Sequence, residues 1–393
     1  MLVKEKIKQA ISILKVRNID CWITFVRESA INHDPMLDFL VETDLTWHSA
    51  LIITSKGDAI AIVGQGDVAN VQDLGVYNEI HSYVEGIQEH FKDVLKKLNP
   101  SKIALNYSID SEISDGLTHG MYKIIYSMLK DIKLHNNIIS AEDIISSLRG
   151  RKSLTETANI KEAIRHTLEI FDLATDFIKP GLTEKQIASF MKQKAKERGL
   201  ELSWDEKYCP GVFTGPNTNV AHYSPTDRKV EKGHILNMDF GVKVNGYCSD
   251  LQRTWYILKD NESVPPDDVV RGFNTVKQSI ELAKEVICPG IQGKNVDFVA
   301  RWHVIINGYE EFKHGVGHQV GIFPHDGYAL LGPEWEKYGS KVLVPLEKDM
   351  VFTIEPKLYV EGKGIATIEE MVVVTENGAE YLSKPQEELF LIK

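Results

Sequence analysis

Residues 238–250 read MDFGVKVNGYCSD, and they place Asp239 and Asp250 on either side of an Asn-Gly pair. An Asn-Gly pair between strand-like segments is a strong signal for a two-residue β-hairpin turn. Two carboxylates that are brought together in one hairpin repel each other. The stretch therefore predicts a hairpin and, with it, a reason for gathering negative charge there.

The predicted turn determines which residues of the hairpin lie opposite each other. It pairs Val244 with Tyr247 and, farther from the turn, Asp239 with Gln252. Because successive side chains alternate between the two faces of a strand, one face is expected to carry Asp239, Gly241, Asp250 and Gln252. The two aspartates then lie about 7–8 Å apart at the backbone, and the glycine leaves room for a cation between them. Two solvated aspartates are the alternative reading of the hairpin alone.

Three other stretches carry candidate metal ligands. His318 lies in HGVGHQVG, where glycines allow the backbone to approach a ligand closely. Glu355 lies in the apolar run MVFTIEP, while Glu369 and Glu370 lie in ATIEEMVVVTENG. A glutamate inside such a strand is costly unless it is paired or bound to a metal. Together with the two aspartates, these stretches predict a metal site of carboxylates and one imidazole.

The chain divides into two regions near Arg149–Lys152. The first 150 residues alternate helical and strand patterns, which predicts an α/β domain; the clearest expected elements are a helix over 3–17 and strands over 21–25, 50–54, 59–63 and 102–107. From SAEDIISSLRG onward, one long helical region runs to a KPG stop signal. A further helix is expected to begin at Thr183 and to end at Gly199. Strand patterns then dominate, apart from helices at about 265–286 and 294–306.

Composition limits the classes of function. Hydrophobic residues make up 43% and charged residues 26% of the 393-residue chain, which is ordinary for a globular protein. The formal net charge of -11 argues against nucleic-acid binding. No apolar run approaches the roughly 20 residues that span a bilayer, and the four cysteines form no CxxC pair. A cytoplasmic protein that binds neither nucleic acid nor membrane is therefore expected.

The order and context of the metal-ligand motifs resemble the pita-bread metallopeptidases. That family includes Xaa-Pro dipeptidases (prolidases), aminopeptidase P and methionine aminopeptidase. The resemblance is carried by MDFG…YCSD, HGVGHQVG, TIEP and TIEEMVVVTENG, and it implies an α+β pita-bread (creatinase/aminopeptidase-like) catalytic domain over 151–393. The α/β region over 1–150 is similar to the N-terminal domain of the prolidase and creatinase branch. Because methionine aminopeptidases generally lack that domain, the prolidase and aminopeptidase P branch is favoured.

The resemblance also implies a set of metal ligands. Two ions would be bound by Asp239, Asp250, His318, Glu355 and Glu369. Asp250 and Glu369 would bridge the ions. Asp239 would chelate one ion, while His318 and Glu355 would hold the other. Glu369 is preferred to its neighbour Glu370 because it occupies the ligand place in the family's IED-type motif.

Such a ligand set is suited to peptide hydrolysis. Two hard cations about 3.5–4 Å apart can share a water and lower its pKa, which yields a hydroxide at neutral pH. Oxygen-rich ligation favours Mn²⁺, while the imidazole also admits Co²⁺, Zn²⁺ or Fe²⁺. The bridging hydroxide would attack an N-terminal Xaa-Pro bond, and Glu355 would carry the proton to the leaving nitrogen. The expected partners are a small peptide substrate and, since relatives are often dimers, a second copy of the chain.

Three further histidines match positions that the family uses. His222 and His325 would be catalytic and contact the scissile carbonyl and the leaving group, and His314 would bind substrate. A lone histidine is more often structural, so these roles rest on the placement of the three residues around the motifs. Histidines outside the motifs, such as His48 and His166, are read as structural.

The sequence departs from the family pattern at three places. Gln252 stands where many prolidases have threonine, and Asp326 stands where a glutamate commonly occurs. Thr367 stands where the proline-specific branch often has arginine, which predicts a roomier and less positive pocket. Arg253 and Lys243 are the cations considered as replacements for that arginine. The departures leave open the preference for dipeptides or longer peptides.

Two other classes of function stay open at this point. One is hydrolysis of another small amide or C–N bond on the same fold, as creatinase-like relatives show. Creatinase lacks the metal-ligand set that this chain carries, which disfavours that particular chemistry. The other class is a non-catalytic binding module, and relatives of that kind usually lose ligands. The complete ligand set favours the metallopeptidase.

Overall fold

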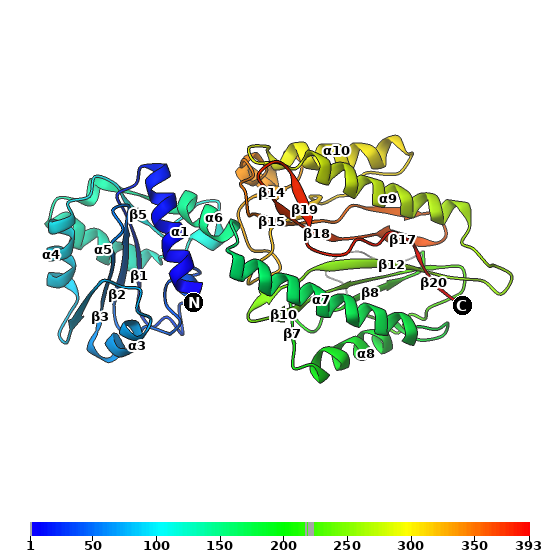
Figure 1. The fold of residues 1–393 in the computed structure, drawn as a ribbon, viewed down its shortest axis with the longest axis horizontal. Helices are drawn as coiled ribbons and strands as arrows, with labels where there is room; N and C mark the ends of the chain where they lie inside the picture. The colour runs from blue at the N-terminus through cyan, green and yellow to red at the C-terminus, as the bar shows by residue number, and fades with distance from the viewer. Residues whose placement is uncertain (1, 217, 219–223) are drawn as a thin grey trace. The chain divides into compact units, whose positions relative to one another are not determined.

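The computed structural model describes residues 2–216, 218 and 224–393. The chain divides into two compact units, Met1–Arg149 and Gly150–Lys393 (Figure 1). The first is an α/β unit and the second is α+β, which confirms the predicted fold class. Within the described residues, no helix combines the length and the apolar character needed to cross a membrane.

The first unit is built on one mixed sheet with the strand order β4-β3-β2-β1-β5-β6. Its strands are β1 (Cys21–Val26), β2 (Ser49–Thr54), β3 (Ala59–Gly64), β4 (Glu79–Tyr83), β5 (Ile103–Leu105) and β6 (Ile138–Ser140). Its helices are α1 (Leu2–Arg17), α2 (Leu37–Leu40), α3 (Val68–Asp73), α4 (Gln88–Leu98), α5 (His119–Asp131) and α6 (Glu142–Gly150). The helix and the four strands predicted above are confirmed. The pattern does not predict the edge strands β4 and β6, which are short and mostly half-buried.

Alternation along β1 explains how this sheet is covered. Phe25 lies in the same buried cluster as Phe91 of α4 and Ile125 of α5. Trp22, which has the opposite parity on β1, donates its indole N–H to Asn106 Oδ1 at 2.6 Å. The first unit therefore has its own core, as an independent α/β domain requires.

The second unit holds four α-helices and fourteen strands among its described residues. The helices are α7 (Leu154–Phe177), α8 (Glu184–Glu197), α9 (Asp267–Val286) and α10 (Gly293–Ile306). The strands up to the long α9 helix are β7 (Glu201–Leu202), β8 (Gly211–Thr214), β9 (Ile235–Phe240), β10 (Val242–Val244), β11 (Tyr247–Cys248) and β12 (Leu251–Ile257). The later strands are β13 (Gly317–His318), β14 (Leu330–Leu331), β15 (Val351–Ile354), β16 (Lys357–Val360), β17 (Gly364–Thr367), β18 (Glu370–Val374), β19 (Ala379–Tyr381) and β20 (Phe390–Ile392).

The strands of the second unit lie between two pairs of helices. In Figure 1, α9 and α10 cover one side of the strands and α7 and α8 cover the other. One large apolar cluster joins residues of α9 and α10 to residues of β15 through β18, including Phe273, Val304 and Phe352. This packing holds the small sheets that carry the candidate ligands in fixed positions.

The start of α7 corrects one expectation. The helical region predicted from SAEDIISSLRG onward is two helices, because Ser153 caps a new one. Its hydroxyl accepts from the Glu156 amide, and the Glu156 carboxylate accepts from the Ser153 amide at 2.7 Å. The helix predicted from Thr183 is confirmed as α8, which Thr183 caps in the same way, and Gly199 beyond its end adopts a φ of +65°.

The hairpin at residues 239–252 has the predicted register. Val244 pairs with Tyr247 and Asp239 pairs with Gln252. The prediction for Gly241 was wrong: a Cβ there would lie 1.9 Å from Ser249 O. The glycine is therefore needed because two backbones meet closely where the hairpin passes from the β9–β12 sheet into the β10–β11 sheet, and it does not leave room for an ion.

Candidate metal centre

Pairing between strands that are distant in sequence brings three acidic residues together. Asp239 on β9 lies opposite Gln252 on β12. Gln252 also forms a bridge with Glu369, whose amide donates to Gln252 O at 3.2 Å. Asp250 lies two residues before Gln252 and so on the same face of the extended chain. These contacts gather Asp239, Asp250 and Glu369 around one point of the sheet.

His318 and Glu355 reach the same point from β13 and β15. Glu355 directly follows β15, and its amide donates to Val316 O at 2.7 Å. His318 ends β13, and its amide donates to Thr353 Oγ1 of β15 at 3.2 Å. The two side chains are thus positioned by one pair of neighbouring strands.

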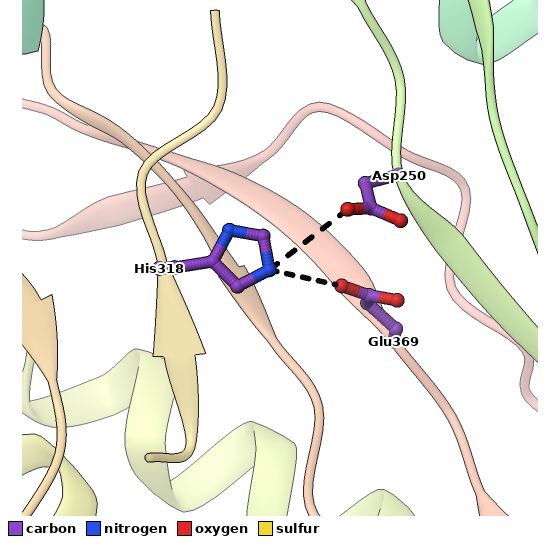
Figure 2. Close-up of side chains that lie close together, drawn as sticks. All are labelled: Asp250, His318 and Glu369. Atoms are coloured by element: carbon purple, nitrogen blue, oxygen red, sulfur yellow. Dashed lines mark ion pairs between the residues drawn. The ribbon is translucent and has the colours of Figure 1, made fainter. Parts of the chain in front are cut away.

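The imidazole of His318 faces three carboxylates. Its Nε2 lies 3.4 Å from Glu355 Oε1, 3.8 Å from Asp250 Oδ2 and 3.9 Å from Glu369 Oε1. Figure 2 shows one ring nitrogen of His318 pointing toward both Asp250 and Glu369, and ligand atoms of these three residues all lie within 4.8 Å of one another. The contacts to Asp250 and Glu369 are too long for hydrogen bonds. They match atoms that each lie about 2 Å from a common ion.

The contact made by the second ring nitrogen of His318 indicates which nitrogen is available to bind a metal. Nδ1 lies 3.3 Å from the carbonyl oxygen of Gln319. A carbonyl can only accept, so Nδ1 is the donor in this contact, and a bound metal would take the lone pair of Nε2. This is the form in which histidine binds a metal.

Asp239 is incompletely satisfied by the protein. Its Oδ1 is buried and has no hydrogen-bond partner within the described part of the chain. Burial and, to a smaller extent, the charge of Glu355 raise the pKa of Asp239 to about 8. An orphaned carboxylate oxygen beside other acids is what a missing cation would leave behind.

The pKa values of the other three acidic residues are also shifted. Burial, followed by repulsion from neighbouring carboxylates, raises the pKa of Asp250 and of Glu369 well above the ordinary range. Burial would also raise the pKa of Glu355, but the hydrogen bond and charge of His318 outweigh it and lower that pKa to about 2. A divalent cation would favour the ionised form of each group. The residues therefore fit a divalent metal site, and four carboxylates with one imidazole suit hard or borderline ions.

Gln252 connects two of the ligand carboxylates. Its Nε2 donates to Glu369 Oε2 at 3.0 Å and lies 3.3 Å from Glu355 Oε2. Its Oε1 accepts from the Thr367 hydroxyl at 3.1 Å. Two departures from the family pattern, Gln252 and Thr367, thus form one hydrogen-bonded pair that orients the carboxylates. Their contact joins residues far apart in the sequence, so it could not be predicted from either residue.

The structure describes two of the three predicted histidines; His222 lies outside the described residues. The His325 ring packs edge-on against His318 at a centroid distance of 4.1 Å. His314 donates from Nδ1 to Gly315 O at 2.8 Å, and burial lowers its pKa to about 4. Its Nε2 is buried and has no partner among the described residues. His314 is therefore a neutral imidazole with an unused acceptor.

The two cations considered as replacements for an arginine at Thr367 lie elsewhere. Arg253 is buried and pairs with Glu370 at 3.1 Å, on the face of the strand opposite Glu369. Lys243 Nζ lies 5.7 Å from the centre of the Phe323 ring. The cation that sequence reasoning missed is Lys357, whose charge acts on Asp239, Glu355 and His314. The available signal was its spacing, since residues two apart on an extended chain share a face.

Comparison with known proteins agrees with this geometry. The model of metallopeptidase family M24 matches residues 158–376. The uncharacterized peptidase YqhT of Bacillus subtilis (strain 168) is 28% identical over 279 residues, which cover 71% of this chain and 73% of that protein.

Two solved structures are similar over nearly the whole chain. The X-Pro aminopeptidase from Thermotoga maritima MSB8 has a TM-score of 0.70 at 24% identity and covers 98% of this chain and 99% of its own. The Xaa-Pro dipeptidase from Bacillus anthracis has a TM-score of 0.71 at 23% identity, with coverage of 99% and 100%. Both matches include the first unit as well as the second, which confirms the resemblance in fold. The chain belongs to metallopeptidase family M24.

Proposed function

We propose that this chain hydrolyses the bond between the first residue and proline in peptides that begin Xaa-Pro, with the help of two divalent metal ions. The observation that carries the proposal is the convergence of His318 Nε2 on three carboxylates, beside the buried Asp239 Oδ1, which has no hydrogen-bond partner among the described residues. The Xaa-Pro class is taken from the names of two solved structures that share the two-unit fold.

The residues proposed to hold the ions are Asp239, Asp250, His318, Glu355 and Glu369. When bound, the ions supply an acidified water and a Lewis acid for the amide carbonyl. Manganese is the ion that the oxygen-rich set favours, with Co²⁺, Zn²⁺ and Fe²⁺ as alternatives.

Glu355 is proposed to move the proton. Its side chain contacts His318 through Oε1 and Gln252 through Oε2, so its orientation is defined from both sides. A carboxylate held ionised in this way can accept a proton from the attacking water and return it to the leaving nitrogen.

The histidines are proposed to contact the substrate. His314 is neutral and offers an unused Nε2 lone pair, which can accept a hydrogen bond from a substrate N–H. His325 lies against His318 and is proposed to contact the leaving group. His222 is proposed for the scissile carbonyl on the resemblance alone. The homodimer, the small peptide partner and the cytoplasmic location remain predictions.

A substrate panel tests the proposed function. Purified chain loaded with Mn²⁺ or Co²⁺ is given Xaa-Pro dipeptides, longer Xaa-Pro peptides and non-proline amides, and initial rates are measured. Hydrolysis of the Xaa-Pro peptides in preference to the other amides is expected. The Glu355→Gln variant should lose roughly 10²–10⁴ in turnover, with its metal content checked by elemental analysis. Cleavage of non-proline amides alone, or of no substrate in the panel, would contradict the proposal.

A further inference from the structure

Lys357 brings a positive charge to a site that is otherwise crowded with carboxylates. It begins β16 and pairs directly with Thr367 of β17. Side chains directly opposite each other in an antiparallel pair lie on the same face, with Cβ atoms about 4.5–5.5 Å apart. The Thr367 hydroxyl donates to Gln252 Oε1 at 3.1 Å, so this face is the one that carries the carboxylate contacts. Lys357 therefore stands beside the ligands.

The ammonium of Lys357 forms no hydrogen bond or ion pair within the described part of the chain. The side chain is half-buried. The ammonium acts electrostatically on Asp239, Glu355 and His314. A partly desolvated cation without a partner is an available site for an anion.

The chemistry of the substrate suggests which anion. In a free dipeptide the C-terminal carboxylate belongs to the residue whose nitrogen leaves, so its carbon lies only two covalent bonds from that nitrogen. A cation that binds it must stand next to the metal ligands. Lys357 lies two residues from Glu355, roughly 6.6 Å along an extended chain, which its four-carbon stem can span.

We infer that Lys357 binds the C-terminal carboxylate of the substrate and thereby makes the chain prefer free dipeptides. The inference rests on the proposed Xaa-Pro hydrolysis and narrows its substrate class. It also accounts for Thr367: an arginine there would directly oppose Lys357, and like charges across a strand pair are destabilising. This chain carries its cation on β16, opposite the position at which the proline-specific branch carries arginine.

The test compares a Xaa-Pro dipeptide with its C-terminal amide on the metal-loaded chain. The wild type should prefer the free acid in kcat/KM. Lys357→Met should lower kcat/KM for the acid by about 10- to 100-fold, the range for a hydrogen bond to a charged group, and should change the amide less than about threefold. The double variant Lys357→Thr/Thr367→Arg returns a cation to the other strand and should recover much of the preference. Lys243→Met is the matched control and should leave the ratio unchanged.

Binding of products gives a second readout that does not depend on turnover. Titration calorimetry with L-proline and L-prolinamide should show that Lys357→Met weakens the acid and spares the amide. An equal loss for acid and amide, or a loss of metal in the Lys357→Met variant, would overturn the role of Lys357. If no peptide is hydrolysed, the proposed function fails. The titration with L-proline still decides whether Lys357 binds a carboxylate.

Discussion

Glu369 directly precedes β18 and Glu370 is its first residue; both are buried at 1% exposure, and they face opposite surroundings. Glu370 accepts from Arg253 at 3.1 Å, from the Ser383 hydroxyl at 2.5 Å and from the Gln386 amide at 2.9 Å. Burial raises the pKa of both glutamates, but the partners of Glu370 oppose that effect, whereas the neighbours of Glu369 are mostly other acids.

The difference separates a structural charge from a functional one. The Glu370 carboxylate has its full complement of donors within the protein, so nothing further is needed to explain its burial. Within the described part of the chain, the Glu369 carboxylate has one amide donor, Gln252, and otherwise faces Asp250 and the His318 ring. A buried acid that the protein leaves this short of compensation is a candidate ligand.

The strongest way to break this comparison is to measure metal binding on both sides of the strand. The wild type is expected to hold close to two Mn²⁺ ions per chain by elemental analysis after dialysis. Asp250→Ala should lose most of this metal, because the proposed role of Asp250 is to hold both ions. Glu370→Gln is the matched variant and should keep the metal. Retention of two ions by Asp250→Ala would remove the distinction between the two faces.

Stability should respond in the opposite way. Glu370→Ala leaves the buried Arg253 without the carboxylate that balances its charge, which is expected to lower the free energy of unfolding by about 3–5 kcal/mol. Glu369→Ala in metal-free protein should not be destabilising to that extent, because it relieves repulsion from the other acids. Urea denaturation of the metal-free variants checks both values. A larger loss for Glu369→Ala than for Glu370→Ala would contradict the interpretation.

The smallest expected effect is a change in metal affinity, and it compares Gln252, which bonds to Glu369, with Gln386, which bonds to Glu370. Gln252→Met removes the amide that orients Glu355 and Glu369, and it should weaken metal affinity about 10- to 100-fold, as for other residues behind metal ligands. Gln386 donates its backbone amide to Glu370, and its side chain bonds to both backbone groups of Thr254. Gln386→Met should therefore lower stability and leave metal affinity unchanged. Chelator competition measures the metal affinities. An equal loss of affinity in both variants would contradict the proposed role of Gln252.

Local signals in the sequence were sufficient for part of this architecture. The Asn-Gly turn predicted the register of the hairpin, and cap residues such as Thr183 predicted helix starts, because both depend on neighbouring residues. The ligand set came from motifs and their resemblance to a family. Gly241 was misread because its constraint arises from close contact with Ser249 O and the Ser203 hydroxyl, and Ser203 is distant in sequence.

Contacts between separate strands could not be predicted in the same way. Nothing around Gln252 indicates that it meets Glu369, and nothing around Lys357 indicates that it lies across from Thr367. These pairings depend on how several short strands of the second unit assemble. The sequence alone therefore predicted a metal centre and hydrolysis of an Xaa-Pro bond, and it left open the preference for dipeptides or longer peptides.

The adjacency of the two glutamates also bears on errors in strand alignment. A slip of one residue moves every side chain of a strand to its other face. If β18 slipped by one residue, one of the two glutamates would still face the metal centre or Arg253. The electrostatic cost of the slip would therefore be only partial. The loop that joins β18 to β19 contains a second Asn-Gly pair, and the Thr375 amide donates to Gly378 O there. That turn, which lies beyond the strand, therefore helps to fix the register that places Glu369 rather than Glu370 at the candidate metal centre.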